Sequence, residues 1–67
     1  MLSARNQFKG VVKAVKLGEV MAEVVVTVGG LEIVSAITRA SAEELGLKAG
    51  DEVTAVIKST EVLIAKG

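Results

Sequence analysis

Residues 20–38 read VMAEVVVTVGGLEIVSAIT, and their pattern of apolar residues indicates the fold class. On each side of Gly29-Gly30, every second residue is apolar over much of the run, which is the period of a β-strand. Glycine enters positive φ freely, so the Gly-Gly pair predicts a tight hairpin between strands at 20–28 and 31–38. The whole chain agrees, because 12 Val, 4 Ile and 4 Thr crowd χ1 and favour pleated strands.

Three more segments show strand patterns. Residues 8–16 alternate before Leu17-Gly18, and residues 52–58 and 61–65 flank Ser59-Thr60. The sequence therefore predicts an all-β domain of five strands.

The period changes once, between the third and fourth strands. Ser41 stands three residues before Glu44, a capping-box spacing that predicts a short helix starting at Ser41. Gly46 suits a left-handed C-cap. Three strands, a short helix and two strands is the order of an OB-fold, so we expect a five-stranded Greek-key barrel with its helix between strands three and four.

The short length of the chain predicts that it assembles with other copies of itself. Its 67 residues form one domain, 1–67, whose hydrophobic stabilisation about matches the conformational entropy lost on folding. Disulfides and structural metals are unavailable, so oligomerisation is the remaining source of stability. Several valines fall on the outward faces of the strands, where a lone barrel would leave them exposed. They are Val11, Val15, Val25 and Val34. The alternative is that bends and bulges turn some of them inward.

Composition excludes several function classes. With no Cys and no His, zinc sites, thiol nucleophiles and imidazole acid–base catalysis are not expected, and we predict no enzymatic activity, no metal ligands and no cofactor. Eight basic and eight acidic residues give zero net charge, and Phe8 is the one aromatic residue. No run is long and apolar enough for a membrane span or a secretory signal. We expect an intracellular protein.

Two short polar segments are rich in hydrogen-bond donors. Residues 3–6 read SARN and residues 58–60 read KST. One guanidinium, one ammonium, hydroxyls and backbone N–H groups suit a tetrahedral oxyanion, whose oxygens only accept. The alternative is that the first segment is a solvated leader and the second an ordinary turn.

Longer motifs carry a resemblance to a known family. SARNQ at 3–7, GEVMAEV at 18–24, SAEELGLKAGD at 41–51 and TAVIKSTEV at 54–62 resemble the molbindins, small bacterial molybdate-binding proteins made of a single Mop domain of the TOBE type. The resemblance covers essentially the whole chain. It implies a cytoplasmic protein that binds molybdate or tungstate for storage, in a hexamer built as a trimer of dimers.

The same resemblance implies a pocket shared between subunits. Ser3 and Arg5 would contact the anion from one subunit, and Lys58 and Ser59 would complete the pocket. Backbone donors would come from Glu19, Val20 and Met21. Asn6 would brace its loop. The position of the family's second class of pocket does not follow from these motifs.

Two other functions stay open. A ligand-free interaction or scaffold module would explain the outward valines equally well. A single-stranded nucleic-acid binder would use the same barrel, but it needs aromatic residues on a basic groove, which this composition does not supply. We therefore expect no nucleic-acid partner and no membrane partner.

Overall fold

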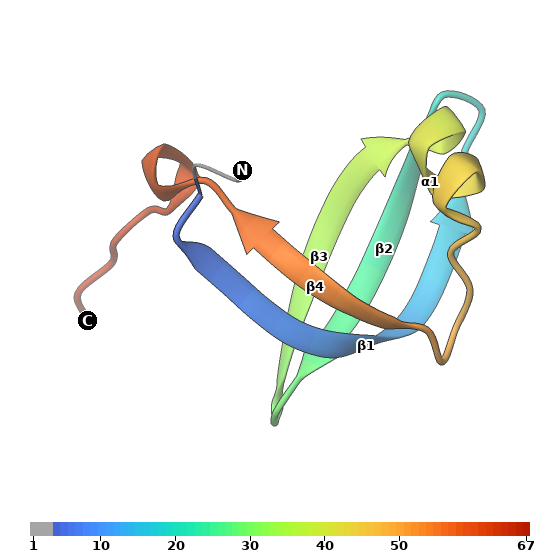
Figure 1. Cartoon of the computed structure of the whole chain (residues 1–67). Coiled ribbons are helices and arrows are strands. Elements are labelled where there is room, and N and C mark those ends of the chain that lie inside the picture. Colours follow the sequence, from blue (N-terminus) through green and yellow to red (C-terminus); the bar gives the residue numbers. More distant parts are fainter. Residues whose placement is uncertain (1–3) are drawn as a thin grey trace.

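The computed structural model describes residues 4–67 as one antiparallel sheet with a short helix. The strands are β1 (Asn6–Leu17), β2 (Met21–Val28), β3 (Leu31–Thr38) and β4 (Glu52–Ile57). Helix α1 (Arg39–Leu45) lies between β3 and β4, and a 3₁₀ turn (Ser59–Glu61) follows β4. The sheet order is β3-β2-β1-β4 (Figure 1). The predicted β-rich fold with a helix after the third strand is confirmed.

Strand β1 is shared by the two halves of the sheet. Its first half pairs with β4, and its second half pairs with β2. The chain curves where it changes partner, so the sheet rolls up (Figure 1). Gly10 lies at this bend, where a Cβ would meet the carbonyl oxygen of Thr27 and would lie 2.9 Å from a methyl group of Val26. This close approach explains why glycine stands there.

The predicted hairpin is confirmed. Val28 pairs with Leu31 across Gly29-Gly30, and Gly29 has φ 59°. Every second side chain of β2 is buried from Ala22 to Val26, and these side chains form most of a small core. The buried side chains are Val12, Ala22, Val24, Val26 and Ala42.

A bulge changes which side of β1 faces the core. The register with β2 shifts between Val12 and Ala14, so one residue is skipped and the alternation reverses. Val15 consequently packs against the core cluster, and its predicted outward position is wrong. Val25 is half-buried. Val11 and Val34 remain exposed, at 44% and 62%.

The helix begins earlier than predicted. Thr38 is the N-cap, and its Oγ1 accepts a hydrogen bond from the Ser41 backbone N–H at 3.1 Å. Ser41 therefore lies inside the helix, because a threonine hydroxyl three residues earlier already satisfies the orphan donor. The predicted left-handed C-cap at Gly46 is confirmed, with φ 61° and ψ 36°.

The predicted fifth strand at 61–65 does not form in this structure. Beyond the 3₁₀ turn the chain is extended without strand pairing, and Leu63 and Ile64 are 92% and 90% exposed. A strand needs a neighbour to take its backbone hydrogen bonds, and this segment runs away from the sheet (Figure 1). The single chain thus builds a four-stranded, open sheet and not the closed five-stranded Greek-key barrel.

Within residues 4–67, no helix has the length and apolar character needed to cross a membrane.

Candidate oxyanion site

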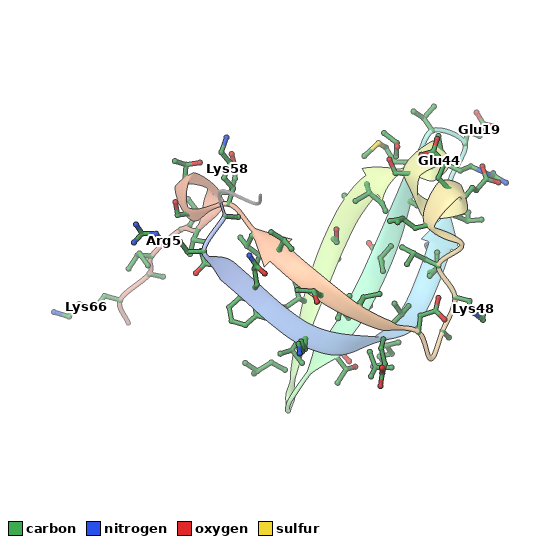
Figure 2. The ribbon with its side chains drawn as sticks, viewed as in Figure 1. Arg5, Glu19, Glu44, Lys48, Lys58 and Lys66 are labelled. Carbon is green, nitrogen blue, oxygen red and sulfur yellow. The ribbon has the colours of Figure 1, made fainter. Side chains whose placement is uncertain are left out.

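The pairing of β1 with β4 brings the two donor-rich segments to one end of the sheet. Asn6 pairs with Ile57 at the last position of this ladder. Arg5 directly precedes Asn6 and Lys58 directly follows Ile57. The two cationic residues therefore lie next to the same end of the β1–β4 pair. Figure 2 shows both side chains at that end of the molecule. Ser3 lies outside the described residues.

Backbone and side-chain hydrogen bonds hold these two segments in place. Asn6 Nδ2 donates to the Ile57 carbonyl oxygen at 3.2 Å, which is the bracing role expected of this residue. Gln7 Nε2 donates to the Ala4 carbonyl oxygen at 3.1 Å. In the 3₁₀ turn, the Glu61 N–H donates to the Lys58 carbonyl oxygen at 2.9 Å. The backbone is therefore fixed around side chains that stay exposed.

The exposed residues with donor groups at this end are Arg5, Lys58, Ser59 and Thr60, and we refer to them together as the donor cluster. It contains two positive charges and two hydroxyls, with Glu61 as the neighbouring carboxylate. Each member is exposed, so solvent or another surface covers the side facing away from the sheet. These donors could hydrogen-bond to one side of a tetrahedral anion, and the oxygens on its other side would need donors from elsewhere.

The predicted backbone donors at Glu19, Val20 and Met21 lie elsewhere. These three residues follow the C-terminal end of β1, a strand of 12 residues. Figure 2 shows Glu19 near helix α1, and the Val20 carbonyl oxygen accepts a hydrogen bond from the N–H of Arg39, the first residue of that helix. One chain therefore does not bring this loop to the donor cluster, because the full length of β1 separates them. A pocket that used both the donor cluster and this loop would need two copies of the chain.

No sequence pattern predicted that Arg39 would contact the loop of residues 18–21. Its Nη1 donates to the Gly18 carbonyl oxygen at 3.2 Å, and its Nε lies 3.6 Å from Glu43 Oε1. The Arg39 N–H also donates to the Val20 carbonyl oxygen at 2.7 Å. Arg39 thus adds a cation to the 18–21 loop. No spacing rule links it to Gly18, because the contact depends on how β3 runs into α1.

The turn before β4 contains the clearest electrostatic feature. Lys48 Nζ lies 2.9 Å from Asp51 Oδ1, and the Lys48 N–H donates to Asp51 Oδ2 at 3.0 Å. The side-chain hydrogen bond from Lys48, followed by the backbone one, lowers the pKa of Asp51. The Asp51 carbonyl in turn accepts from the Val12 N–H at 2.9 Å. This ion pair therefore orders the entry to β4 and is not part of the donor cluster.

Comparison with known proteins decides the family. The TOBE domain model matches residues 2–64. Molybdenum-pterin-binding protein 3 of Clostridium pasteurianum is 58% identical over 64 residues, which is 94% of each chain. The chain belongs to the TOBE domain family and is of the molbindin type. A further relative of this TOBE domain, molybdenum-pterin-binding protein 1 of the same organism, is 56% identical over 64 residues, again 94% of each chain.

Solved structures match this TOBE domain closely. A molybdate-binding protein from Sporomusa ovata superposes with a TM-score of 0.94 at 42% identity, covering 98% of both chains. MopII from Clostridium pasteurianum gives 0.92 at 54% identity, covering 98% of this chain and 100% of that one. The cytoplasmic molybdate-binding protein ModG, solved with molybdate bound, gives 0.83 at 47% identity over 88% of this chain and 43% of that one.

Proposed function

We propose that this TOBE domain binds molybdate and tungstate in pockets between subunits, as an intracellular store of the oxyanion. The observation that supports the proposal is the register of β1 with β4, which pairs Asn6 with Ile57 and so brings the segments that contain Arg5 and Lys58 to the same end of the sheet. Relatives named as molybdenum-pterin-binding and molybdate-binding proteins support it.

The chemistry of the anion fits the donor cluster. Molybdate is a dianion whose oxygens only accept hydrogen bonds, so leaving water is costly unless donors replace its hydration shell. The Arg5 guanidinium supplies two parallel charge-assisted bonds, and Lys58 and Ser59 supply further donors. Ser3 would add a hydroxyl beside Arg5. The opposite side of the anion is left to another subunit, whose loop of Glu19, Val20 and Met21 offers backbone N–H groups.

The surface of a single chain supports assembly. The chain exposes 5458 Å², about a third more than the ~4,000 Å² expected for a compact monomer of this size. This excess of roughly 1,400 Å² on one chain is larger than the roughly 800 Å² that each partner buries in a standard interface. The proposed assembly is a hexamer, a trimer of dimers, in which the five-stranded Greek-key barrel becomes closed.

The relatives and the matching family model support three further parts of the proposal: a binding role without catalysis, the compartment and the number of domains. They are named as binding proteins, which supports a ligand-binding protein and not an enzyme. ModG is described as cytoplasmic, and we propose the same compartment here. The match of the family model to residues 2–64 supports a single domain, 1–67.

A ligand-free interaction module is the second candidate. Exposed apolar residues on β3 favour it, because Leu31 is 73% and Val34 62% exposed and such surfaces mark interfaces. This candidate accounts for assembly but not for the cations at the β1–β4 edge.

Titration calorimetry with molybdate, tungstate and phosphate separates the two candidates. We expect saturable binding of molybdate and tungstate, with phosphate much weaker, because partly protonated phosphate brings a donor to a pocket made of donors. Elemental analysis of the purified protein should also find molybdenum or tungsten. No heat with either metal oxyanion would favour the interaction module, and equal affinity for all three anions would contradict a dedicated pocket.

A further inference from the structure

Arg39, the first residue of α1, makes two hydrogen bonds to the loop of residues 18–21. Its backbone N–H donates to the Val20 carbonyl oxygen at 2.7 Å, and its guanidinium Nη1 donates to the Gly18 carbonyl oxygen at 3.2 Å. The loop has one closing bond of its own, from the Gly18 N–H to the Met21 carbonyl oxygen at 2.8 Å. Arg39 therefore fixes two carbonyl groups of this loop.

The side-chain bond is the one that depends on arginine. Any residue other than proline at position 39 would supply the N–H that reaches Val20, because this bond extends the β2–β3 ladder beyond the pair of Met21 with Thr38. The bond to Gly18 instead joins α1 to the end of a different hairpin. It needs a long side chain with a hydrogen-bond donor at its tip.

The bond to Gly18 sets the direction of the Glu19 N–H. The Gly18 carbonyl and the Glu19 N–H belong to one planar trans peptide, so they point in opposite directions. Within residues 4–67, the Glu19 N–H donates to no backbone carbonyl. When Arg39 holds the carbonyl, this free N–H is therefore turned away from the guanidinium and stays available to a ligand.

Glycine at position 18 makes this peptide easy to turn. A Cβ there would lie 2.9 Å from the Met21 carbonyl oxygen, so the tight loop requires glycine. Glycine also has the widest choice of backbone angles, and the peptide that follows it can adopt more than one orientation. A contact from outside the loop is needed to select one of them, and the Arg39 guanidinium supplies it.

The charge of Arg39 also matters at this end of the molecule. Figure 2 shows Glu19 and Glu44 close to α1, and Glu43 Oε1 lies 3.6 Å from Arg39 Nε. A dianion at the loop would be repelled by these carboxylates. The guanidinium opposes that repulsion, and its side chain is 42% exposed.

We propose that Arg39 is a positioning residue of the anion site, which holds the Gly18–Glu19 peptide so that the Glu19 N–H faces an oxyanion bound by the donor cluster of another copy. The inference rests on the proposed function, which assigns this loop to the anion. It adds a residue of α1 that does not touch the anion and that still raises the affinity for it.

Two variants of Arg39 test this role. Arg39→Met keeps a long side chain but removes the donor and the charge, whereas Arg39→Lys keeps a charge and a donor of similar reach. Titration calorimetry should show roughly tenfold weaker molybdate binding by Arg39→Met and partial recovery by Arg39→Lys. Wild-type affinity in Arg39→Met would overturn the inference, and so would an equal loss in both variants.

A spectroscopic measurement separates positioning from general stability. In ¹⁵N–¹H spectra, molybdate should shift the Glu19 amide signal of the wild type, and this shift should be reduced in Arg39→Met. Lys48→Met is the matched control, because it removes a cation that is paired with Asp51 and not with the loop. It should keep the Glu19 shift and the wild-type affinity. An undiminished Glu19 shift in Arg39→Met would contradict the positioning role.

Amide hydrogen exchange of the ligand-free protein makes the test independent of the anion. The Gly18 N–H, which closes the loop, should exchange several-fold faster in Arg39→Met than in the wild type or in Lys48→Met. Unchanged exchange would show that the guanidinium does not hold the loop and would overturn the inference. A wild-type protein that binds no molybdate would instead contradict the proposed function, whatever the exchange rates are.

Discussion

Asn6 donates a hydrogen bond from its Nδ2 to the carbonyl oxygen of Ile57 at 3.2 Å, and this bond ties the segment after Arg5 to the segment before Lys58. It lies at the last pair of the β1–β4 ladder, where strand ends otherwise fray. The spacing between the two cations therefore depends on a side chain that we do not expect to touch the anion.

Replacing Asn6 should weaken anion binding indirectly. Asn6→Ala removes the bond to Ile57, and we expect about 1 kcal/mol of lost stability with a several-fold lower molybdate affinity. Thr54→Ala is the matched control, because Thr54 is an exposed residue of β4 whose side chain makes no hydrogen bond within residues 4–67. Thermal unfolding and titration calorimetry measure both variants. Equal affinity in the two would show that Asn6 does not position the site.

Gly10 should tolerate no side chain. Gly10→Ala places a methyl group against the Thr27 carbonyl and the valine methyls of β2, and overpacking of this kind costs about 1–3 kcal/mol. Gly30→Ala is the control, since its Cβ would meet nothing within 4 Å, and its stability should stay within about 0.5 kcal/mol of the wild type. Denaturant unfolding compares them. Equal stability would place the bend of β1 elsewhere.

Acid should loosen the turn before β4. The pKa of Asp51 is lowered from its usual 3.8 by the hydrogen bonds from Lys48, so the carboxylate stabilises the fold fully above that value. The contribution is lost as the pH falls through the lowered folded-state pKa. Asp51→Asn should lower stability at neutral pH and reduce the loss of stability in acid. Unfolding between pH 7 and pH 2, with Glu44→Gln as control, measures this, and an unchanged acid profile in Asp51→Asn would refute it.

The parts of the fold that the sequence predicts are those with local causes. Gly29-Gly30 specifies a hairpin by backbone freedom, and the alternation along β2 specifies its buried face. The bulge at Lys13 was not predictable, because it arises where β1 changes partner and leaves no local signal. Val15 is consequently turned inward. The helix start at Arg39 was missed because Thr38, the last residue of a strand, doubles as the cap.

The candidate site also has parts that the sequence predicts and parts that it does not. The resemblance pairs Arg5 with Lys58, and the antiparallel register of β1 and β4 brings the segments that contain them to the same end of the sheet. The loop of Glu19, Val20 and Met21 could not be placed from sequence, because its distance from the donor cluster depends on the length and the curvature of β1. Residues 61–65 have a strand-like composition, but a strand forms only where a neighbour accepts its hydrogen bonds.

The molybdate affinity of Arg5→Ala tests whether this end of the β1–β4 pair binds the anion. Loss of a guanidinium from a desolvated oxyanion should weaken binding by ~2–5 kcal/mol, or roughly 30- to several-thousand-fold. Arg5→Lys should recover part of it, because an ammonium keeps the charge but loses the planar pair of donors. Lys9→Ala, an exposed cation of β1, is the control.

The measurement is titration calorimetry of the three variants and the wild type with molybdate, alongside sedimentation of the ligand-free proteins. We predict strong loss for Arg5→Ala, partial loss for Arg5→Lys, wild-type affinity for Lys9→Ala, and an unchanged assembly in all four. Wild-type affinity in Arg5→Ala would contradict the proposal that the β1–β4 edge binds the anion.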